Sequence, residues 1–196
     1  MEVSFVNLVE TAVDALVSYN IISASMRRFY EYSIEIIIER LISLASMFLI
    51  AVCLRKVIPA ILFLSFFLLL RRHTGGYHAS SFTKCYVESI LIFTIIMIYG
   101  DIITLSHIVV IVALSASITI IMIVGTINHP NMGFSNAELR ESKKTARYVL
   151  ILEILVVLSL YFLGASEQCI VFMSWGIILC AISIVVAKIS KQEVEK

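Results

Sequence analysis

The chain has 196 residues, of which 60% are apolar and only 15% are Asp, Glu, Lys or Arg. Its mean hydropathy of +1.01 excludes an ordinary soluble domain and intrinsic disorder, because both carry more charge and fewer apolar side chains. The 15 Lys and Arg residues balance 14 Asp and Glu residues, so the basic excess of a nucleic-acid-binding protein is missing. The composition predicts an all-α polytopic membrane protein in which residues 1–196 form a single domain.

The first segment, residues 1–33, predicts an amphipathic helix that lies on the membrane surface. From Val3 to about Tyr30 apolar side chains recur at helical spacing, and acidic residues such as Glu10 and Asp14 lie off that stripe. A helix that packs against the membrane domain fits the same pattern. No basic region followed by a small-residue cleavage site marks a secretory signal, so we expect the segment to be retained.

Six apolar runs follow, and they predict about six membrane segments. Each of the first two is shorter than the roughly 20 residues of a full span, which predicts a shallow or tilted hairpin around Arg55 and Lys56. Residues 34–38 extend the first run if the neighbouring charged side chains reach the interface. The runs are Leu41–Leu54, Val57–Leu70, Ser89–Tyr99, Ile108–Val124, Tyr148–Leu163 and Ile170–Ala187.

The distribution of Lys and Arg predicts the orientation, since cytoplasmic loops are enriched in both. With both termini inside, every Lys and Arg except Arg55 and Lys56 faces the cytoplasm, and connectors 100–106 and 165–168 carry neither residue type. We therefore expect a multi-pass protein of the cell membrane with cytoplasmic ends. Its two polar cytoplasmic segments are residues 71–88 and 128–147.

Residues 71–88 hold the residue types that carry chemistry. A cysteine attacks a carbonyl as its thiolate, which forms beside a histidine, beside a cation or at the start of a helix. Cys85 has His78 nearby in sequence and stands at the expected start of a helix. Gly75 and Gly76 tolerate the backbone angles that let N–H groups converge on an oxyanion. The pattern predicts a Cys/His nucleophilic site.

Three other functions fit parts of this pattern. A metallohydrolase would bind its metal through His73, His78 and Cys85, but the segment lacks the HExxH or CxxC spacing of common sites. A loop that binds lipid headgroups needs only the Arg and His side chains. A non-enzymatic binding or transport protein needs polar groups within the membrane, and the later runs hold few besides Asp101 and Glu153.

The same segment resembles the signature of the accessory gene regulator B (AgrB) peptidases, membrane cysteine endopeptidases of Gram-positive quorum sensing. The chain length, the polar start and the position of the motif after two apolar runs agree with that family. The residues that carry the resemblance are Arg72, Gly75–Gly76, His78–Ala79, Cys85, Pro130 and Lys143–Lys144.

The resemblance implies that Cys85 is the nucleophile and His78 the general base, with no cofactor. It implies as substrate a membrane-associated pro-peptide similar to AgrD, whose carboxyl-terminal part is removed. A Cys or Ser of the peptide would then resolve the acyl-enzyme, giving a thiolactone or lactone ring. It also implies a homodimer, surrounded by membrane lipids.

The spacing of His78 and Cys85 constrains the backbone. On one straight helix, residues seven apart lie about 10.5 Å apart along the axis, too far for a hydrogen bond between the two side chains. We therefore expect a break between Gly75 and Lys84, or pairing with a second copy. A third residue that orients the base comes from one of these candidates: Glu88, Ser80, Ser81, Asn128 and Asn131.

The second polar segment, residues 128–147, predicts a loop followed by a short helix. Pro130 interrupts any preceding helix, and Ser135 or Asn136 can cap a new one that runs through Lys143 and Lys144. These lysines, with Arg71 and Arg72, are candidates for binding the acidic part of a peptide substrate. Binding to anionic lipids is the alternative. Further along, Glu153 is expected at interface depth or paired with His129 or a loop cation.

Overall fold

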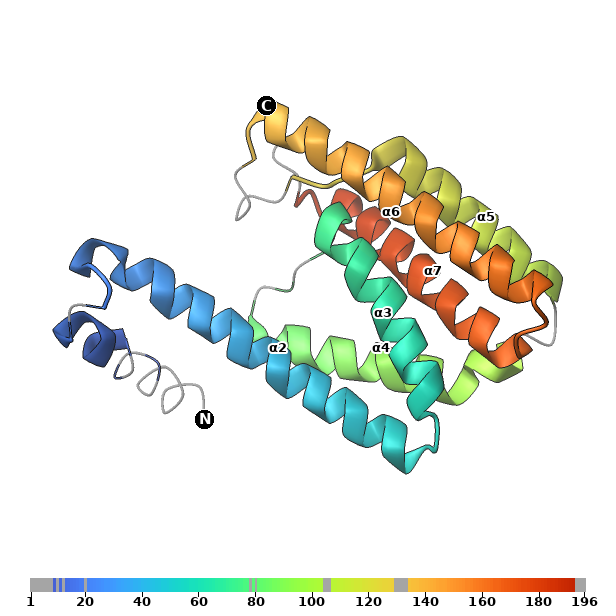
Figure 1. Ribbon diagram of the computed structural model, residues 1–196, viewed down its shortest axis with the longest axis horizontal. Coiled ribbons are helices and arrows are strands. Elements are labelled where there is room, and N and C mark those ends of the chain that lie inside the picture. The colour runs from blue at the N-terminus through green and yellow to red at the C-terminus, as the bar shows by residue number, and fades with distance from the viewer. Residues whose placement is uncertain are drawn as a thin grey trace. The chain divides into compact units, whose positions relative to one another are not determined.

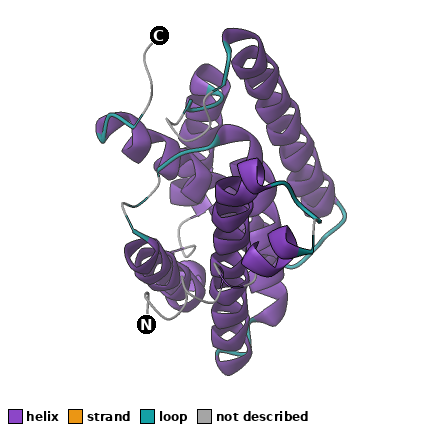
Figure 2. Ribbon diagram, turned by 90° about the vertical axis from the view of Figure 1, so that its left-hand side faces the viewer, coloured by secondary structure: helices purple, strands orange, loops and turns teal. Residues whose placement is uncertain are grey.

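The computed structural model describes residues 9, 11, 13–19, 21–77, 79, 81–103, 107–128 and 134–192. Every regular element among these residues is a helix, and Figure 2 shows no strand in the part that it colours. The predicted all-α fold is therefore confirmed. The elements are η1 (Ala24–Met26), α2 (Arg27–Cys53), α3 (Val57–Thr74), α4 (Phe82–Ile103), α5 (His107–Val124), α6 (Asn136–Phe162) and α7 (Glu167–Ile189).

The chain forms two compact units, residues 1–46 and 47–196. In the first unit, the structure corrects the extent of the predicted amino-terminal helix. Helical residues end at Ser18, residues 21–23 are not helical, and α2 begins at Arg27. The hydroxyl groups of Ser23 and Ser25 lie 2.9 Å apart in this break. The apolar spacing alone did not reveal this break.

Two helices are longer than the apolar runs that predicted them. The run 41–54 is only the second half of α2, which has 27 residues. The short helix through Lys143–Lys144 and the run 148–163 are one continuous helix, α6, also of 27 residues. Charged residues such as Glu, Lys and Arg are good helix formers, so a helix continues where the hydropathy falls.

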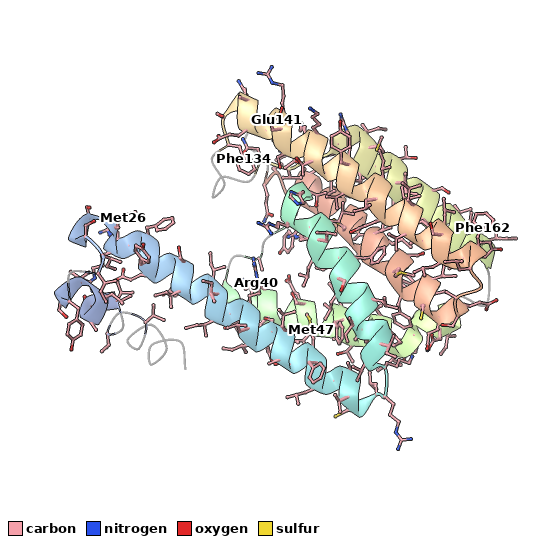
Figure 3. All side chains as sticks on the ribbon, in the orientation of Figure 1. Met26, Arg40, Met47, Phe134, Glu141 and Phe162 are labelled. Atoms are coloured by element: carbon pink, nitrogen blue, oxygen red, sulfur yellow. The ribbon has the colours of Figure 1, made fainter. Side chains whose placement is uncertain are left out.

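Five helices are long and apolar enough to cross a membrane, and α5 provides a shorter apolar helix. Together they account for the six predicted segments. The outer faces expose large aliphatic and aromatic side chains instead of polar ones, as the sticks along the helices in Figure 3 show. Such faces suit hydrocarbon and not water, so the architecture is that of a membrane protein. Examples on three helices are Leu91, Ile95, Ile98, Ile111, Val112, Ile123, Leu152, Leu155 and Leu158.

Helix α7 is the central helix of the second unit. It packs against α3, α4, α5 and α6, and its interface with α3 is the most extensive (Figure 1). Gly176 allows this close approach: a Cβ atom there would lie 2.9 Å from the Phe63 carbonyl oxygen and 3.0 Å from the Phe67 nitrogen. The backbones of α3 and α7 therefore nearly touch, which positions the carboxyl-terminal end of α3 against α7.

The connectors of the second unit gather at two ends of the helices, as the charge distribution predicted. At one end, the Lys56 ammonium group forms an ion pair with Asp101, with 2.6 Å between Nζ and Oδ2. Gln168 donates to the same carboxylate across 3.3 Å. Lys56, Asp101 near the end of α4, and Gln168 near the start of α7 thus lie together, away from the polar segments at the other end. The cytoplasmic location of that other end stays a prediction.

Glu153 is a buried carboxyl group in α6. Its side chain is 3% exposed, and neither carboxyl oxygen has a hydrogen-bond partner among the described residues. The predicted pairing with a loop cation is therefore absent from the described part of the chain, and His129 lies outside it. Buried neighbours on the same helix are Leu150 and Val157. An unpartnered polar group in such surroundings costs free energy in either protonation state.

Replacing Glu153 with leucine should therefore stabilise the protein. We expect the free energy of unfolding to rise by about 1–3 kcal/mol, because an apolar side chain of similar volume needs no partner. Thermal unfolding in detergent measures the change. The matched control is Glu141→Leu on the exposed part of α6, where we expect a change within about 0.5 kcal/mol. A lower midpoint for Glu153→Leu than for the wild type would contradict this account.

Candidate active site

The break between α3 and α4 lies in the segment that carries the Cys/His motif. Helix α3 ends at Thr74, residues 75–77 and 79 are not helical, and α4 begins at Phe82. The predicted break is confirmed. Its cause is local: Gly75 has φ 64° and Gly76 has φ 129°, angles that side chains with a Cβ rarely adopt.

Residues from two other segments hold the end of α3. The His73 carbonyl accepts hydrogen bonds from the Thr126 hydroxyl, at 2.9 Å, and the Ser142 hydroxyl, at 3.1 Å. The next carbonyl, of Thr74, accepts from the Ile127 N–H at 2.8 Å. These carbonyls have no partner within α3 because they belong to its last turn. The α5–α6 connection and the first half of α6 therefore lie against the start of the motif.

The Arg71 side chain binds the two backbone carbonyl groups on either side of Gly76. Its Nη1 atom donates to the Gly75 carbonyl at 2.5 Å and to the Ser183 hydroxyl at 2.6 Å, and its Nη2 atom donates to the Tyr77 carbonyl. The Gly75 N–H donates to the Arg71 carbonyl at 3.1 Å. With this N–H engaged, the predicted oxyanion role is disfavoured for Gly75, and for Gly76 it stays a prediction. We call Arg71, Gly75, Gly76, Tyr77 and Ser183 the turn clamp.

Helix α7 completes the turn clamp. The Tyr77 N–H donates to the Ser183 carbonyl at 3.0 Å and also lies 3.2 Å from the Ser183 hydroxyl oxygen. The backbone N–H and carbonyl of Tyr77 are therefore both bound, the first by α7 and the second by Arg71. A turn held on both sides is pre-organised, which is the requirement for a group that follows it to act in catalysis.

Cys85 lies in the first turn of α4, and its residue is exposed with a free thiol. The Cys85 N–H donates to the Ser81 carbonyl at 3.0 Å, which continues the helical hydrogen bonding back to the break. The first turn of a helix presents backbone N–H groups that interact favourably with negatively charged groups. The proposed base, His78, lies outside the described residues, as do Ser80 and Asn131.

The predicted substrate-binding cations differ in their surroundings. Arg72 and Lys144 are exposed, whereas Lys143 is half-buried against Gly125, whose added Cβ would lie 2.9 Å from the Lys143 Cγ. Arg71 is partly buried and bound to the turn, so we assign it to the turn clamp in place of substrate binding. Arg72 and Lys144 remain the accessible candidates.

Three of the candidates for a third catalytic residue are described: Ser81, Asn128 and Glu88. Ser81 is exposed just before α4, and its hydroxyl oxygen accepts from the Lys84 N–H at 3.4 Å. Asn128 is buried, and its amide group both donates to the Phe134 carbonyl and accepts from the Phe134 N–H, each at 3.2 Å. Its side chain therefore joins residue 128 to residue 134, just before α6. Glu88 is exposed on α4, one turn after Cys85. The helix that follows the loop begins as predicted, with Ser135 as its N-cap in a capping box with Glu138.

The described residues hold no group of three His, Cys, Asp or Glu side chains that could bind a metal ion. Because His78 is not among them, the metal site predicted for His73, His78 and Cys85 lies partly outside the described chain. Sequence reasoning missed Thr126, Ser142 and Ser183. Serine and threonine are common in membrane helices, and nothing in their local sequence distinguishes these three.

Comparison with known proteins agrees with the motif. The sequence model of the family described as accessory gene regulator B matches residues 9–184, most of the chain. The match includes the turn clamp, Cys85 and the basic first half of α6. No curated protein and no solved structure matches the chain.

Proposed function

The chain belongs to the accessory gene regulator B family, which processes the agr quorum-sensing peptide, and we propose that it acts as a membrane cysteine endopeptidase. The substrate is an AgrD-like pro-peptide that loses its carboxyl-terminal part. One observation carries the proposal. Cys85 is an exposed thiol in the first turn of α4, and the turn before it is bound on both sides by tertiary hydrogen bonds.

In the proposed reaction His78 takes the proton of the Cys85 thiol, and the sulfur attacks the scissile carbonyl. The tetrahedral oxyanion collapses, the C–N bond breaks, and the leaving amine takes the proton from His78. The amino-terminal part of the peptide stays on Cys85 as a thioester. A Cys or Ser side chain of the same peptide then attacks this thioester, which closes the ring and returns the proton to Cys85.

Cyclisation competes with hydrolysis of the thioester. Exchange between two thioesters is nearly balanced in free energy, whereas hydrolysis is downhill, so the site must hold the internal thiol close and keep water away. Ile92, an exposed apolar side chain two turns after Cys85 on the same face of α4, supports partial exclusion of water. Comparable yields of linear and cyclic product in bilayers would contradict this part of the proposal.

The experiment uses purified protein in liposomes with a synthetic AgrD-like pro-peptide, and mass spectrometry measures the amounts of cleaved linear and cyclic product. We expect treatment with iodoacetamide to abolish cleavage and treatment with EDTA to leave it unchanged. Inhibition by EDTA, reversed by added zinc, would instead favour the metallohydrolase. If protein with an unmodified Cys85 does not cleave the pro-peptide, the proposed peptidase activity is wrong.

The proposal places the active site on the cytoplasmic side of the cell membrane, with both termini on the same side. Cys169, near the start of α7, lies at the opposite end of the helices from Cys85 and serves as a control. An impermeant maleimide applied to intact cells should label Cys169 and spare Cys85, and the reverse pattern would overturn the orientation. A homodimer, as the family suggests, is part of the proposal; cross-linking in native membranes tests it.

A further inference from the structure

We infer that Ser183 of α7 is a positioning residue, which acts through Arg71 to orient the chain where it enters His78. The inference rests on the proposed Cys/His function. Ser183 presents two oxygen atoms to the turn: its hydroxyl accepts from Arg71 at 2.6 Å, and its carbonyl accepts from the Tyr77 N–H at 3.0 Å. It is the point where α7 meets the motif.

Arg71 orients the chain before His78 by binding one peptide group. Arg71 donates to the Tyr77 carbonyl, and that carbonyl belongs to the peptide bond that joins Tyr77 to His78. Because a peptide group is planar, binding its carbonyl oxygen restrains the plane of the peptide group that follows Tyr77. Ser183 binds the preceding N–H and also holds the guanidinium in place. Both ends of residue 77 therefore depend on Ser183.

The charge of Arg71 makes this dependence strong. Among the described residues no carboxylate forms an ion pair with Arg71; the ion pairs found involve Arg27 and Lys56. Its acceptors are neutral oxygen atoms, so no negative charge among the described residues offsets its positive charge. Hydrogen bonds to a charged group are stronger than those between neutral groups, and the loss of one leaves the charge less well solvated.

The packing of α7 against α3 explains why a small hydroxyl residue stands at position 183. Gly176, seven residues earlier on the same face, brings the two helix backbones together. At the end of this contact a Cβ on Gly76 would lie 1.7 Å from Arg71 Nη1 and 2.7 Å from the Ser183 hydroxyl oxygen. Glycine at position 76 therefore leaves room for the Arg71 guanidinium and the Ser183 hydroxyl to meet.

The test measures Cys85 directly and needs no peptide. Full-length protein in liposomes reacts with iodoacetamide at several pH values, and mass spectrometry resolves the rate at Cys85 from those at the other cysteines. We expect Ser183→Ala to lower the Cys85 rate at pH 7 about tenfold or more, the consequence of one lost hydrogen bond to a charged group. The matched control is Ser174→Ala on the same helix, whose hydroxyl only donates to Ile170 within α7.

A second pair of variants separates the hydroxyl from the packing. Threonine and valine have nearly the same shape, so Ser183→Thr should retain a faster Cys85 rate than Ser183→Val. A double variant tests whether Ser183 acts through Arg71. With Arg71→Lys already present, Ser183→Ala should lower the Cys85 rate much less than it does alone. Wild-type Cys85 reactivity in Ser183→Ala, equal rates for the Thr and Val variants, or independent effects of Arg71 and Ser183 would overturn the inference.

These outcomes are distinct from failure of the proposed function. If His78→Ala leaves the Cys85 rate of the otherwise unchanged protein as it was, the Cys/His pair itself is wrong. If His78→Ala lowers that rate and Ser183→Ala does not, only the role of Ser183 is wrong. The His78→Ala variant is therefore measured in parallel with every Ser183 variant.

Discussion

Replacing His78 or Cys85 with alanine should each lower the rate of pro-peptide cleavage at least about 10³-fold, with no further loss in the double variant. The two residues form one unit in the proposed reaction, since the base has no proton to accept without the thiol. Loss of either member therefore removes the same step. Single-turnover cleavage in liposomes, followed by mass spectrometry, measures the three rates.

Two control variants accompany this experiment. Cys53→Ala removes another exposed free thiol, on α2, and His73→Ala removes the other histidine of the motif while its carbonyl still binds Thr126 and Ser142. We expect both to cleave at rates within a few-fold of the wild type. Effects of His78→Ala and Cys85→Ala that multiply in the double variant would show that the two residues act independently, against the proposed pair.

Gly76→Ala should be the most damaging single substitution in the turn clamp. The added Cβ would lie 1.7 Å from Arg71 Nη1, far inside van der Waals contact, at a residue with φ 129°. Arg71 must then leave the Gly75 and Tyr77 carbonyls, or the backbone must change. We expect the free energy of unfolding to fall by about 2–4 kcal/mol and cleavage to be lost. Thermal unfolding in detergent and the liposome assay measure the two effects.

Gly164→Ala is the matched control, because Gly164 also has a positive φ, 74°, but nothing lies within 4 Å of its added Cβ. It carries the backbone strain without the clash, so we expect a loss of about 1–2 kcal/mol and normal cleavage. Equal stability and activity of the two variants would show that the crowding around Gly76 is not what holds the turn.

Much of the fold follows from local patterns in the chain. The apolar runs predict the membrane segments, the Gly75–Gly76 pair and the spacing of His78 and Cys85 predict the break before α4, and Ser135 predicts the start of α6. The lengths of the helices were predicted less accurately than their number. A membrane segment predicted from hydropathy ends at the first charged residues. The helix itself continues through them, as the first halves of α2 and α6 show.

The reactive residues of the candidate site could be predicted from the sequence, whereas the residues that position them could not. Its reactive residues, Cys85 and His78, stand in one short stretch and are recognisable from their types and spacing. The side chains that bind this stretch by hydrogen bonds are those of Thr126, Ser142 and Ser183, which lie 53 to 112 residues away from their partners in sequence. No local pattern distinguishes these hydroxyl groups from the other serines and threonines of the helices.

The chain sequence is thus sufficient for what depends on neighbours in sequence: helix formation, membrane character, the glycine turn and the chemistry of the motif. Packing of distant helices settles the rest. Among the described residues, the burial of Glu153 without a hydrogen-bond partner, the pairing of Lys56 with Asp101 and the binding of Arg71 by Ser183 all depend on how the helices pack. The physical reason is that hydropathy and helix propensity act within a few residues, whereas these contacts depend on how closely two backbones approach, as they do at Gly176.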